Sequence, residues 1–129
     1  MLLENLRILY VEDDPDTQRL IKKILSSSAK EVIVASDGEE GLRFYQEHQP
    51  DIVLTDICMP KMDGLEMCKA IKEINPDQPI GIFTAFNEPE YLKKAADLDI
   101  GTYILKPFDR KQFFNSLEYL KMVVESQKS

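Results

Sequence analysis

The chain has 129 residues, of which 43% are hydrophobic and 30% charged, and this is the length and composition of a single globular domain. Its formal net charge of −7 comes without a basic stripe, which argues against direct binding to nucleic acid. No segment approaches the apolar length needed to cross a bilayer, and the first residues lack the apolar stretch of a signal peptide. We therefore expect a cytoplasmic protein without a membrane partner, whose two cysteines are free thiols.

The first predicted element is a strand over Leu6–Val11, an apolar run that ends at Glu12. Continuous apolar runs of this length are typical of strands buried on both faces of a sheet. Asp14 followed by Pro15 is a typical helix start, and apolar residues follow at helical spacing. The same pattern of strand and helix is predicted four more times, with strands at 32–35, 51–55, 80–84 and 102–105 and helices through Leu42, from about Gly64, from about Pro89 and from near Asp109.

Strict alternation of strands and helices predicts an α/β protein with a mainly parallel sheet and helices on both faces. The last helix carries an apolar stripe at three- and four-residue steps, from Phe113 to Val124. Only the tail, Glu125–Ser129, is predicted to be unstructured. We expect one domain over residues 1–129, with its core between about residues 6 and 125.

The strand ends predict where a site lies. In an open parallel sheet, ligands bind beyond the carboxyl ends of the strands. Chemically active residues follow four of the five predicted strands: Glu12-Asp13-Asp14, Asp56, Thr84 and Lys106. The second strand ends without such a group, which suits an edge strand away from the site.

These residue types suggest chemistry when they are taken together. Carboxylates held close together repel each other unless a cation neutralises them, and hard oxygen ligands suit Mg²⁺. A lysine and a hydroxyl nearby complete a set that binds a phosphoryl group, and a carboxylate can itself be the nucleophile. One acidic residue at a strand end is ordinary loop chemistry. The prediction therefore depends on the whole set meeting at one rim.

The sequence resembles the receiver domain of bacterial two-component response regulators, the family that includes the chemotaxis regulator. The segments that carry the resemblance, in order along the chain, are Ile8–Asp14, Asp51–Asp56, Met59–Gly64, Phe83–Ala85 and Tyr103–Phe108. The resemblance covers almost the whole chain from about Arg7. It implies a flavodoxin-like, five-stranded parallel sheet in the order 2-1-3-4-5, with five helices on both faces.

The resemblance also implies a metal site beside a phosphoacceptor. Asp56 would accept the phosphoryl group and bind Mg²⁺ or Mn²⁺. Asp13 would be a direct metal ligand, and Glu12 would act mainly through a metal-bound water. The backbone carbonyl of Cys58 would be a further ligand. Glu12 stands where aspartate is more frequent in the family, which tolerates the exchange.

Other positions are implied to bind and sense the phosphoryl group. Lys106 would pair with its oxygens, and the Thr84 hydroxyl would donate a hydrogen bond to it. Tyr103 would be an aromatic switch that turns inward as Thr84 moves. The Lys106–Pro107 peptide bond would be cis.

The function implied is a phosphorylation-activated signalling switch in a phosphorelay. A histidine kinase or phosphotransfer protein would donate the phosphoryl group, and a downstream output domain or effector would bind the switched surface. A homodimer would form through the fourth helix, fifth strand and fifth helix. The chain would catalyse its own phosphorylation and dephosphorylation, although it is primarily a switch.

Three alternatives have different sequence requirements. A metal-dependent phosphatase of this kind usually has a second aspartate two residues after its nucleophile, where this chain has Cys58. A flavin-binding module needs a phosphate-cradling loop after the first strand, where Glu12-Asp13-Asp14 would repel a phosphate. A receiver-shaped interaction module that works without phosphorylation remains the alternative.

Overall fold

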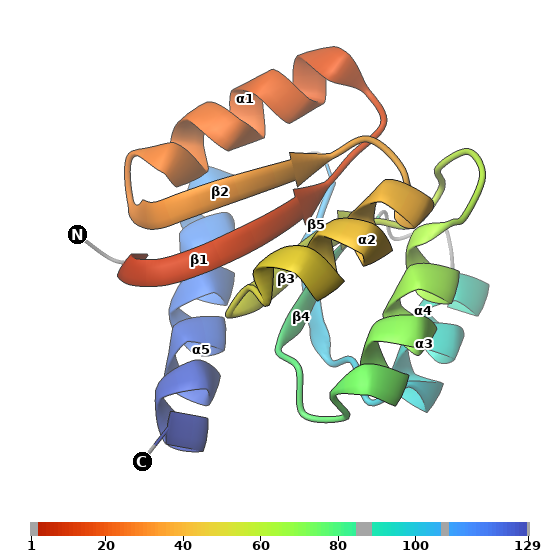
Figure 1. The fold of residues 1–129 in the computed structure, drawn as a ribbon. Helices are drawn as coiled ribbons and strands as arrows, with labels where there is room; N and C mark the ends of the chain where they lie inside the picture. The colour runs from red at the N-terminus through yellow and green to blue at the C-terminus, as the bar shows by residue number, and fades with distance from the viewer. Residues whose placement is uncertain (1–2, 85–88, 107–108, 129) are drawn as a thin grey trace.

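Five parallel strands alternate with five helices in the part of the chain that the structure, a computed structural model, describes: residues 3–84, 89–106 and 109–128 (Figure 1). The elements are β1 Leu3–Val11, α1 Pro15–Ser26, β2 Ala29–Ala35, α2 Gly38–His48, β3 Ile52–Asp56, α3 Gly64–Ile74, β4 Ile80–Thr84, α4 Pro89–Asp97, β5 Thr102–Leu105 and α5 Arg110–Lys128. The strand order is β2-β1-β3-β4-β5, and every neighbouring pair is parallel. The predicted fold class and strand order are confirmed, and β2 is an edge strand as expected.

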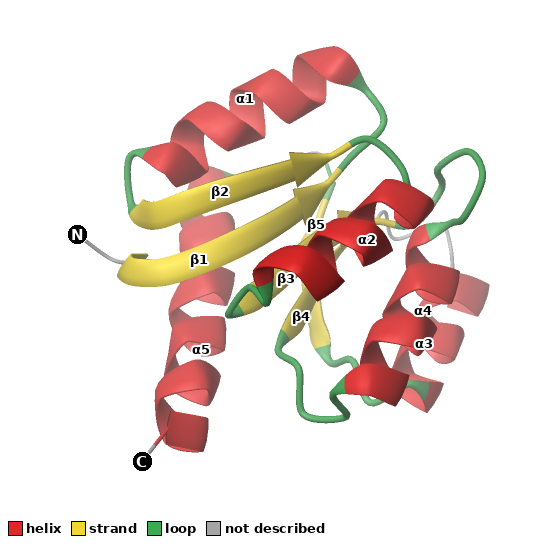
Figure 2. Ribbon diagram, in the orientation of Figure 1, coloured by secondary structure: helices red, strands yellow, loops and turns green. Residues whose placement is uncertain are grey.

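The helices form two layers, one on each face of the sheet (Figure 2). The side chains of α1 and α5 pack on one face, against Ile8, Tyr10 and Leu54, among others. Those of α2, α3 and α4 pack on the other face, against residues such as Leu9 and Val53. Successive residues of β1 thus enter opposite hydrophobic clusters, because side chains alternate along a strand. Covered faces on both sides explain why the strands are continuous apolar runs.

Aspartate caps start three of the helices. The side chains of Asp14, Asp37 and Asp63 accept hydrogen bonds from backbone N–H groups in the first turns of α1, α2 and α3. Such a cap stabilises a helix by about 1 kcal/mol. Asp14 and Asp37 closely follow the ends of β1 and β2, so polar residues beyond these strand ends start the next helices.

The first strand pair is longer than the sequence indicates. Leu3 pairs with Ala29, although the predicted strand begins at Leu6, and Leu3 is fully buried in the core. Glu4 and Asn5 are exposed and interrupt the apolar run, so the apolar pattern did not predict this part of the strand. The register shifts between Leu3 and Arg7, which is typical of a β-bulge.

The predicted loose tail is wrong, because α5 continues to Lys128. The Gln127 side chain donates to the backbone carbonyl of Asp77 at 2.6 Å, and Lys128 Nζ lies 3.4 Å from Asp51 Oδ1. These partners are at least 50 residues away in the sequence. Local sequence alone therefore could not show that the last turn has contacts.

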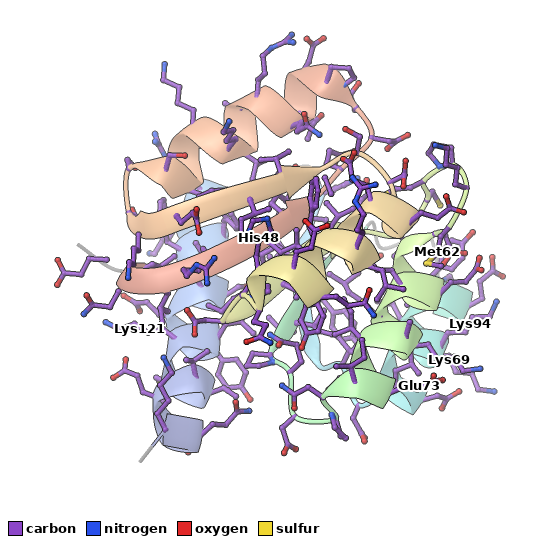
Figure 3. All side chains as sticks on the ribbon, viewed as in Figure 1. His48, Met62, Lys69, Glu73, Lys94 and Lys121 are labelled. Carbon is purple, nitrogen blue, oxygen red and sulfur yellow. The ribbon has the colours of Figure 1, made fainter. Side chains whose placement is uncertain are left out.

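Charged side chains are spread over the outer surface and include both signs. Lys69 and Glu73 project from α3, Lys94 from α4 and Lys121 from α5 (Figure 3). This mixture is consistent with the absence of a basic stripe in the sequence. Among the described residues, no helix has the length and apolar character needed to span a membrane.

A buried amide joins three segments at the amino-terminal end of the sheet. Gln78 is 4% exposed; its Oε1 accepts from the Tyr45 hydroxyl at 2.8 Å. Its Nε2 donates to the carbonyls of Asp51 and Pro79, both at 3.0 Å. This network ties α2 to the starts of β3 and β4.

Replacing Gln78 by alanine is expected to lower the free energy of unfolding by about 2–4 kcal/mol, because buried polar groups lose their partner. Urea unfolding followed by circular dichroism measures the change. The matched control is Gln46→Ala on the exposed side of α2, which should change stability by less than about 0.5 kcal/mol. Equal effects of the two substitutions would contradict this role of Gln78.

Candidate functional site

Three carboxylates meet at the carboxyl ends of β1 and β3. Oxygen atoms of Glu12, Asp13 and Asp56 lie within 4.8 Å of one another. β1 and β3 are hydrogen-bonded neighbours, with Val11 opposite Thr55, and this pairing brings the acidic residues together. Glu12 is only 3% exposed, whereas Asp13 is exposed and Asp56 half-buried. The cluster therefore has a buried base and a side that solvent reaches.

Lys106 forms an ion pair with Asp56 through Nζ and Oδ2. The backbone N–H of Lys106 donates to the carbonyl of Thr84 at 2.8 Å, which holds the end of β5 against β4. Thr84 is 2% exposed and is the last residue of β4. Asp56 lies opposite Phe83 in the register, so Thr84 is one residue nearer the rim. The structure thus brings together residues from four strands that the sequence singled out.

The electrostatics of Glu12 show how crowded this rim is. The pKa of Glu12 is raised from 4.5 to about 7, chiefly by burial and also by the negative charge of Asp56. The Asp14 backbone N–H, 3.1 Å from Glu12 Oε2, and the Lys106 ammonium act in the opposite direction. Three carboxylates with one ammonium leave excess negative charge that a divalent cation would offset. Carboxylate oxygens are the donors that Mg²⁺ and Mn²⁺ prefer, so this residue set fits the predicted metal.

Glycine permits the close approach that shapes the acceptor end of β3. Gly64 N–H donates to the carbonyl of Ile57 at 2.7 Å. A Cβ atom at Gly64 would lie 2.0 Å from the backbone oxygen of Asp56, a distance at which the chain must shift. Gly64 therefore fixes the position of the Asp56 backbone.

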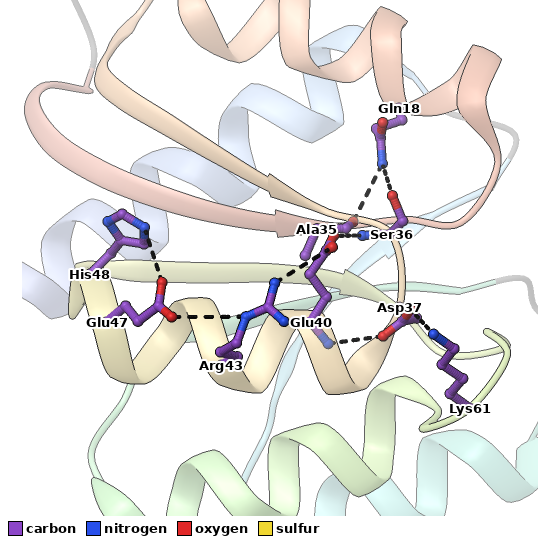
Figure 4. Close-up of polar contacts among 9 residues, drawn as sticks. All are labelled: Gln18, Ala35, Ser36, Asp37, Glu40, Arg43, Glu47, His48 and Lys61. Atoms are coloured by element: carbon purple, nitrogen blue, oxygen red, sulfur yellow. Dashed lines mark hydrogen bonds and ion pairs between the residues drawn. The ribbon is translucent and has the colours of Figure 1, made fainter.

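The loop between β3 and α3 is tied to the start of α2. Gly38 N–H donates to the carbonyl of Met62 at 3.0 Å, and Lys61 Nζ lies 3.8 Å from Asp37 Oδ2 (Figure 4). Lys61 has a φ of 66°, in the left-handed region that few side chains adopt. These contacts hold the loop that carries Cys58. The sequence shows Asp37-Gly38 only as a turn signal, so its contact with this loop was not predicted.

Cys58 is exposed, and its Sγ lies 3.7 Å from the Tyr91 hydroxyl of α4. Cys58 follows Asp56 by two residues in the sequence. The role of its backbone carbonyl as a metal ligand stays a prediction. Cys68 is a buried free thiol, and burial raises its pKa to about 12. No disulfide bond joins Cys58 and Cys68.

Tyr103 and Thr84 lie on the same face of the sheet. Ile82 pairs with Tyr103 and Thr84 with Leu105, and residues two apart in a strand share a face. Tyr103 packs with the cluster under α3 and α4, and its hydroxyl donates to the Ile100 carbonyl at 2.6 Å. The predicted cis bond involves Pro107, which lies outside the described residues.

A cavity of about 680 Å³ lies at the other end of the molecule, between α5 and the amino-terminal ends of β4 and β5. Its lining includes Pro79, Thr102 and Tyr119. Ligands of open parallel sheets bind beyond the opposite, carboxyl ends. We therefore place the functional site at the acidic rim.

The fold and the rim define a doubly wound α/β domain with an acidic, lysine-bearing site at its carboxyl edge. Residues 8–118 match the response regulator receiver domain family, and the chain belongs to that family. The general function of these domains is that of a phosphorylation-activated switch in two-component systems.

Individual relatives agree with this assignment. The chain is 36% identical over 110 residues to the alkaline phosphatase synthesis transcriptional regulatory protein PhoP of Bacillus subtilis, a match that covers 84% of this chain and 45% of that protein. The N-terminal domain of an uncharacterized protein from Wolinella succinogenes has a similar structure, with 37% identity, a TM-score of 0.87, and coverage of 95% of this chain and 98% of that one. The chemotaxis response regulator CheY4 of Vibrio cholerae is 25% identical with a TM-score of 0.82, over 91% of this chain and 99% of its own. The chain spans less than half the length of the curated relatives it matches.

Gly64→Ala is expected to lower the free energy of unfolding by about 2–4 kcal/mol and to weaken Mg²⁺ binding, because the new Cβ displaces the Asp56 backbone. Urea unfolding and calorimetric titration with MgCl₂ measure the two effects. Gly101→Ala is the matched control, because a Cβ there meets nothing within 4 Å. Unchanged Mg²⁺ affinity in a folded Gly64→Ala protein would contradict the positioning role.

Glu12→Gln is expected to stabilise the protein above about pH 7 when divalent cations are chelated. Between pH 4.5 and about 7 the folded protein keeps a proton on Glu12 that the unfolded chain releases. The stability of the wild type therefore falls as the pH rises through this range.

Because glutamine does not ionise, the melting temperature of the variant minus that of the wild type should grow between about pH 4.5 and 8. Glu73→Gln, exposed on α3, is the control and should show a constant difference (Figure 3). A constant difference for Glu12→Gln as well would show that the pKa of Glu12 is not raised.

Proposed function

We propose that Asp56 accepts a phosphoryl group from a histidine kinase or phosphotransfer protein in a Mg²⁺-dependent reaction. The observation that carries the proposal is the position of Asp56, which lies within 4.8 Å of two other carboxylates and in an ion pair with Lys106. This is the arrangement that a negatively charged phosphoryl group requires, since it needs both a nucleophile and neutralising charge.

In the transfer, a carboxylate oxygen of Asp56 forms a P–O bond as the P–N bond to the donor histidine breaks, and the imidazole leaves. Lys106 neutralises charge on the phosphoryl oxygens. Mg²⁺ or Mn²⁺, held by Glu12, Asp13, Asp56 and the Cys58 carbonyl, supplies further positive charge when bound. The chain thereby catalyses its own phosphorylation and, with water as acceptor, its dephosphorylation, mainly through positioning and charge.

The switch follows from the new charge on Asp56. The Thr84 hydroxyl moves to donate to a phosphoryl oxygen, and Tyr103 leaves the Ile100 carbonyl and turns inward. These changes alter the surface formed by α4, β5 and α5. That surface binds an output domain or effector, or a second copy of the chain in a homodimer. As a phosphoprotein of a phosphorelay, the chain works in the cytoplasm.

The second candidate is an interaction module that keeps the receiver shape but is never phosphorylated. Such a module has no need for Asp13, Asp56, Thr84 and Lys106 together. The ion pair between Lys106 and Asp56 supports the phosphorylated switch, because the ammonium lies beside the carboxylate that would carry the phosphoryl group.

Incubation with Mg²⁺ and a small acyl phosphate is expected to raise the intact mass of the wild type by one phosphoryl group, and Asp56→Asn should show no gain. Removal of Mg²⁺ with a chelator should abolish the gain. A folded wild type that gains no mass from the acyl phosphate or from a histidine kinase would favour the non-phosphorylated module. A gain in Asp56→Asn would move the acceptor elsewhere.

A further inference from the structure

Tyr10 carries a buried hydroxyl that has no hydrogen-bond partner among the residues that the structure describes. The residue is 0% exposed, in the middle of the core face toward α1 and α5. Other tyrosine hydroxyls are paired: that of Tyr45 donates to Gln78, and that of Tyr103 to the Ile100 carbonyl. Phenylalanine would pack the same ring without burying an unpaired donor, so the hydroxyl of Tyr10 calls for a reason other than packing.

Tyr10 lies near the end of β1 that leads to the acidic rim. Tyr10 precedes Glu12 by two residues on β1 and its extension, so the two side chains leave the backbone on the same side. Burial raises the pKa of Tyr10, and the negative charges of Glu12 and Asp56 act in the same direction. Glu12 is itself buried, and its Oε2 accepts a hydrogen bond from the Asp14 N–H at 3.1 Å. A buried donor without a partner among the described residues and a buried carboxylate are thus two residues apart on the same side of the chain.

The ring of Tyr10 also touches the strand that ends in Thr84. It meets Phe83 edge to face, with ring centres 5.8 Å apart and an interplanar angle of 67°. Phe83 packs in turn against Phe113 of α5, at 5.7 Å. Phe83 directly precedes Thr84, so the ring that contacts Tyr10 is one residue from the end of β4.

We propose that Tyr10 is a positioning residue of the switch, whose hydroxyl donates a hydrogen bond to the Glu12 carboxylate when metal and phosphoryl group are bound. This inference rests on the proposed function. The bond orients Glu12 toward the metal-bound water, as partners of metal ligands commonly do. The concerted movement of Phe83 and Thr84 makes room for it. The hydroxyl then stabilises the phosphorylated arrangement and destabilises the one described here.

The test compares wild type, Tyr10→Phe and Tyr45→Phe in EDTA, in Mg²⁺, and in Mg²⁺ with beryllium fluoride, a stable mimic of an aspartyl phosphate. Tyr10→Phe is expected to melt at a higher temperature than the wild type in EDTA, because an unpaired buried donor is removed. Its melting temperature should rise less than that of the wild type when Mg²⁺ and beryllium fluoride are added. Calorimetric titration should show Mg²⁺ affinity weakened by about tenfold.

Tyr45→Phe is the matched control, since it removes a hydroxyl at the far end of the sheet. It should melt lower in EDTA and keep the wild-type response to Mg²⁺ and beryllium fluoride. Equal responses of Tyr10→Phe and wild type would overturn the inference and leave the proposed function standing. A lower melting temperature of Tyr10→Phe in EDTA would also overturn it, because the hydroxyl would then already be paired. A wild type without any response would overturn the proposed function and this inference with it.

Discussion

Repulsion among three carboxylates at one rim of the sheet is the constraint on which the site depends. Glu12, Asp13 and Asp56 are held together because β1 and β3 are hydrogen-bonded neighbours, with their apolar residues buried between two helical layers. That packing opposes the electrostatic cost of the cluster. Lys106 offsets part of the negative charge, and a divalent cation would offset more. The remaining negative charge is the physical basis for the proposed binding of a cation and a phosphoryl group.

Backbone contacts give this rim its shape. Gly64 lets the Asp56 carbonyl and the first turn of α3 come together. The Gly38 N–H donates a hydrogen bond to Met62 in the loop that carries Cys58. The adjacent residues Asp13 and Asp14 have different structural roles. Asp13 lies in the acidic cluster, whereas Asp14 caps α1. A site built from strand ends is therefore held by the helices that start beside it.

β4 connects the rim to both helical layers. Thr84 shares a sheet face with Tyr103, beneath α3 and α4, whereas Phe83 contacts Tyr10 and Phe113 on the face toward α5. The alternation of side chains along a strand produces this division. The end of β4 therefore contacts side chains on both faces of the sheet, toward α3 and α4 on one face and toward α5 on the other.

The sequence by itself determined the alternation of strands and helices, the parallel sheet and the ends of β1, β3, β4 and β5, because these depend on local patterns of apolar and polar residues. It also singled out Glu12, Asp13, Asp56 and Lys106, since parallel strands bring their carboxyl ends to one edge. Only the tertiary structure decided the pairing of Leu3 with Ala29 and the helical turn that ends at Lys128. It alone showed the approach of Gly38 to Met62 and the unpaired hydroxyl of Tyr10. Each of these depends on residues distant in the chain, whose meeting no local pattern records.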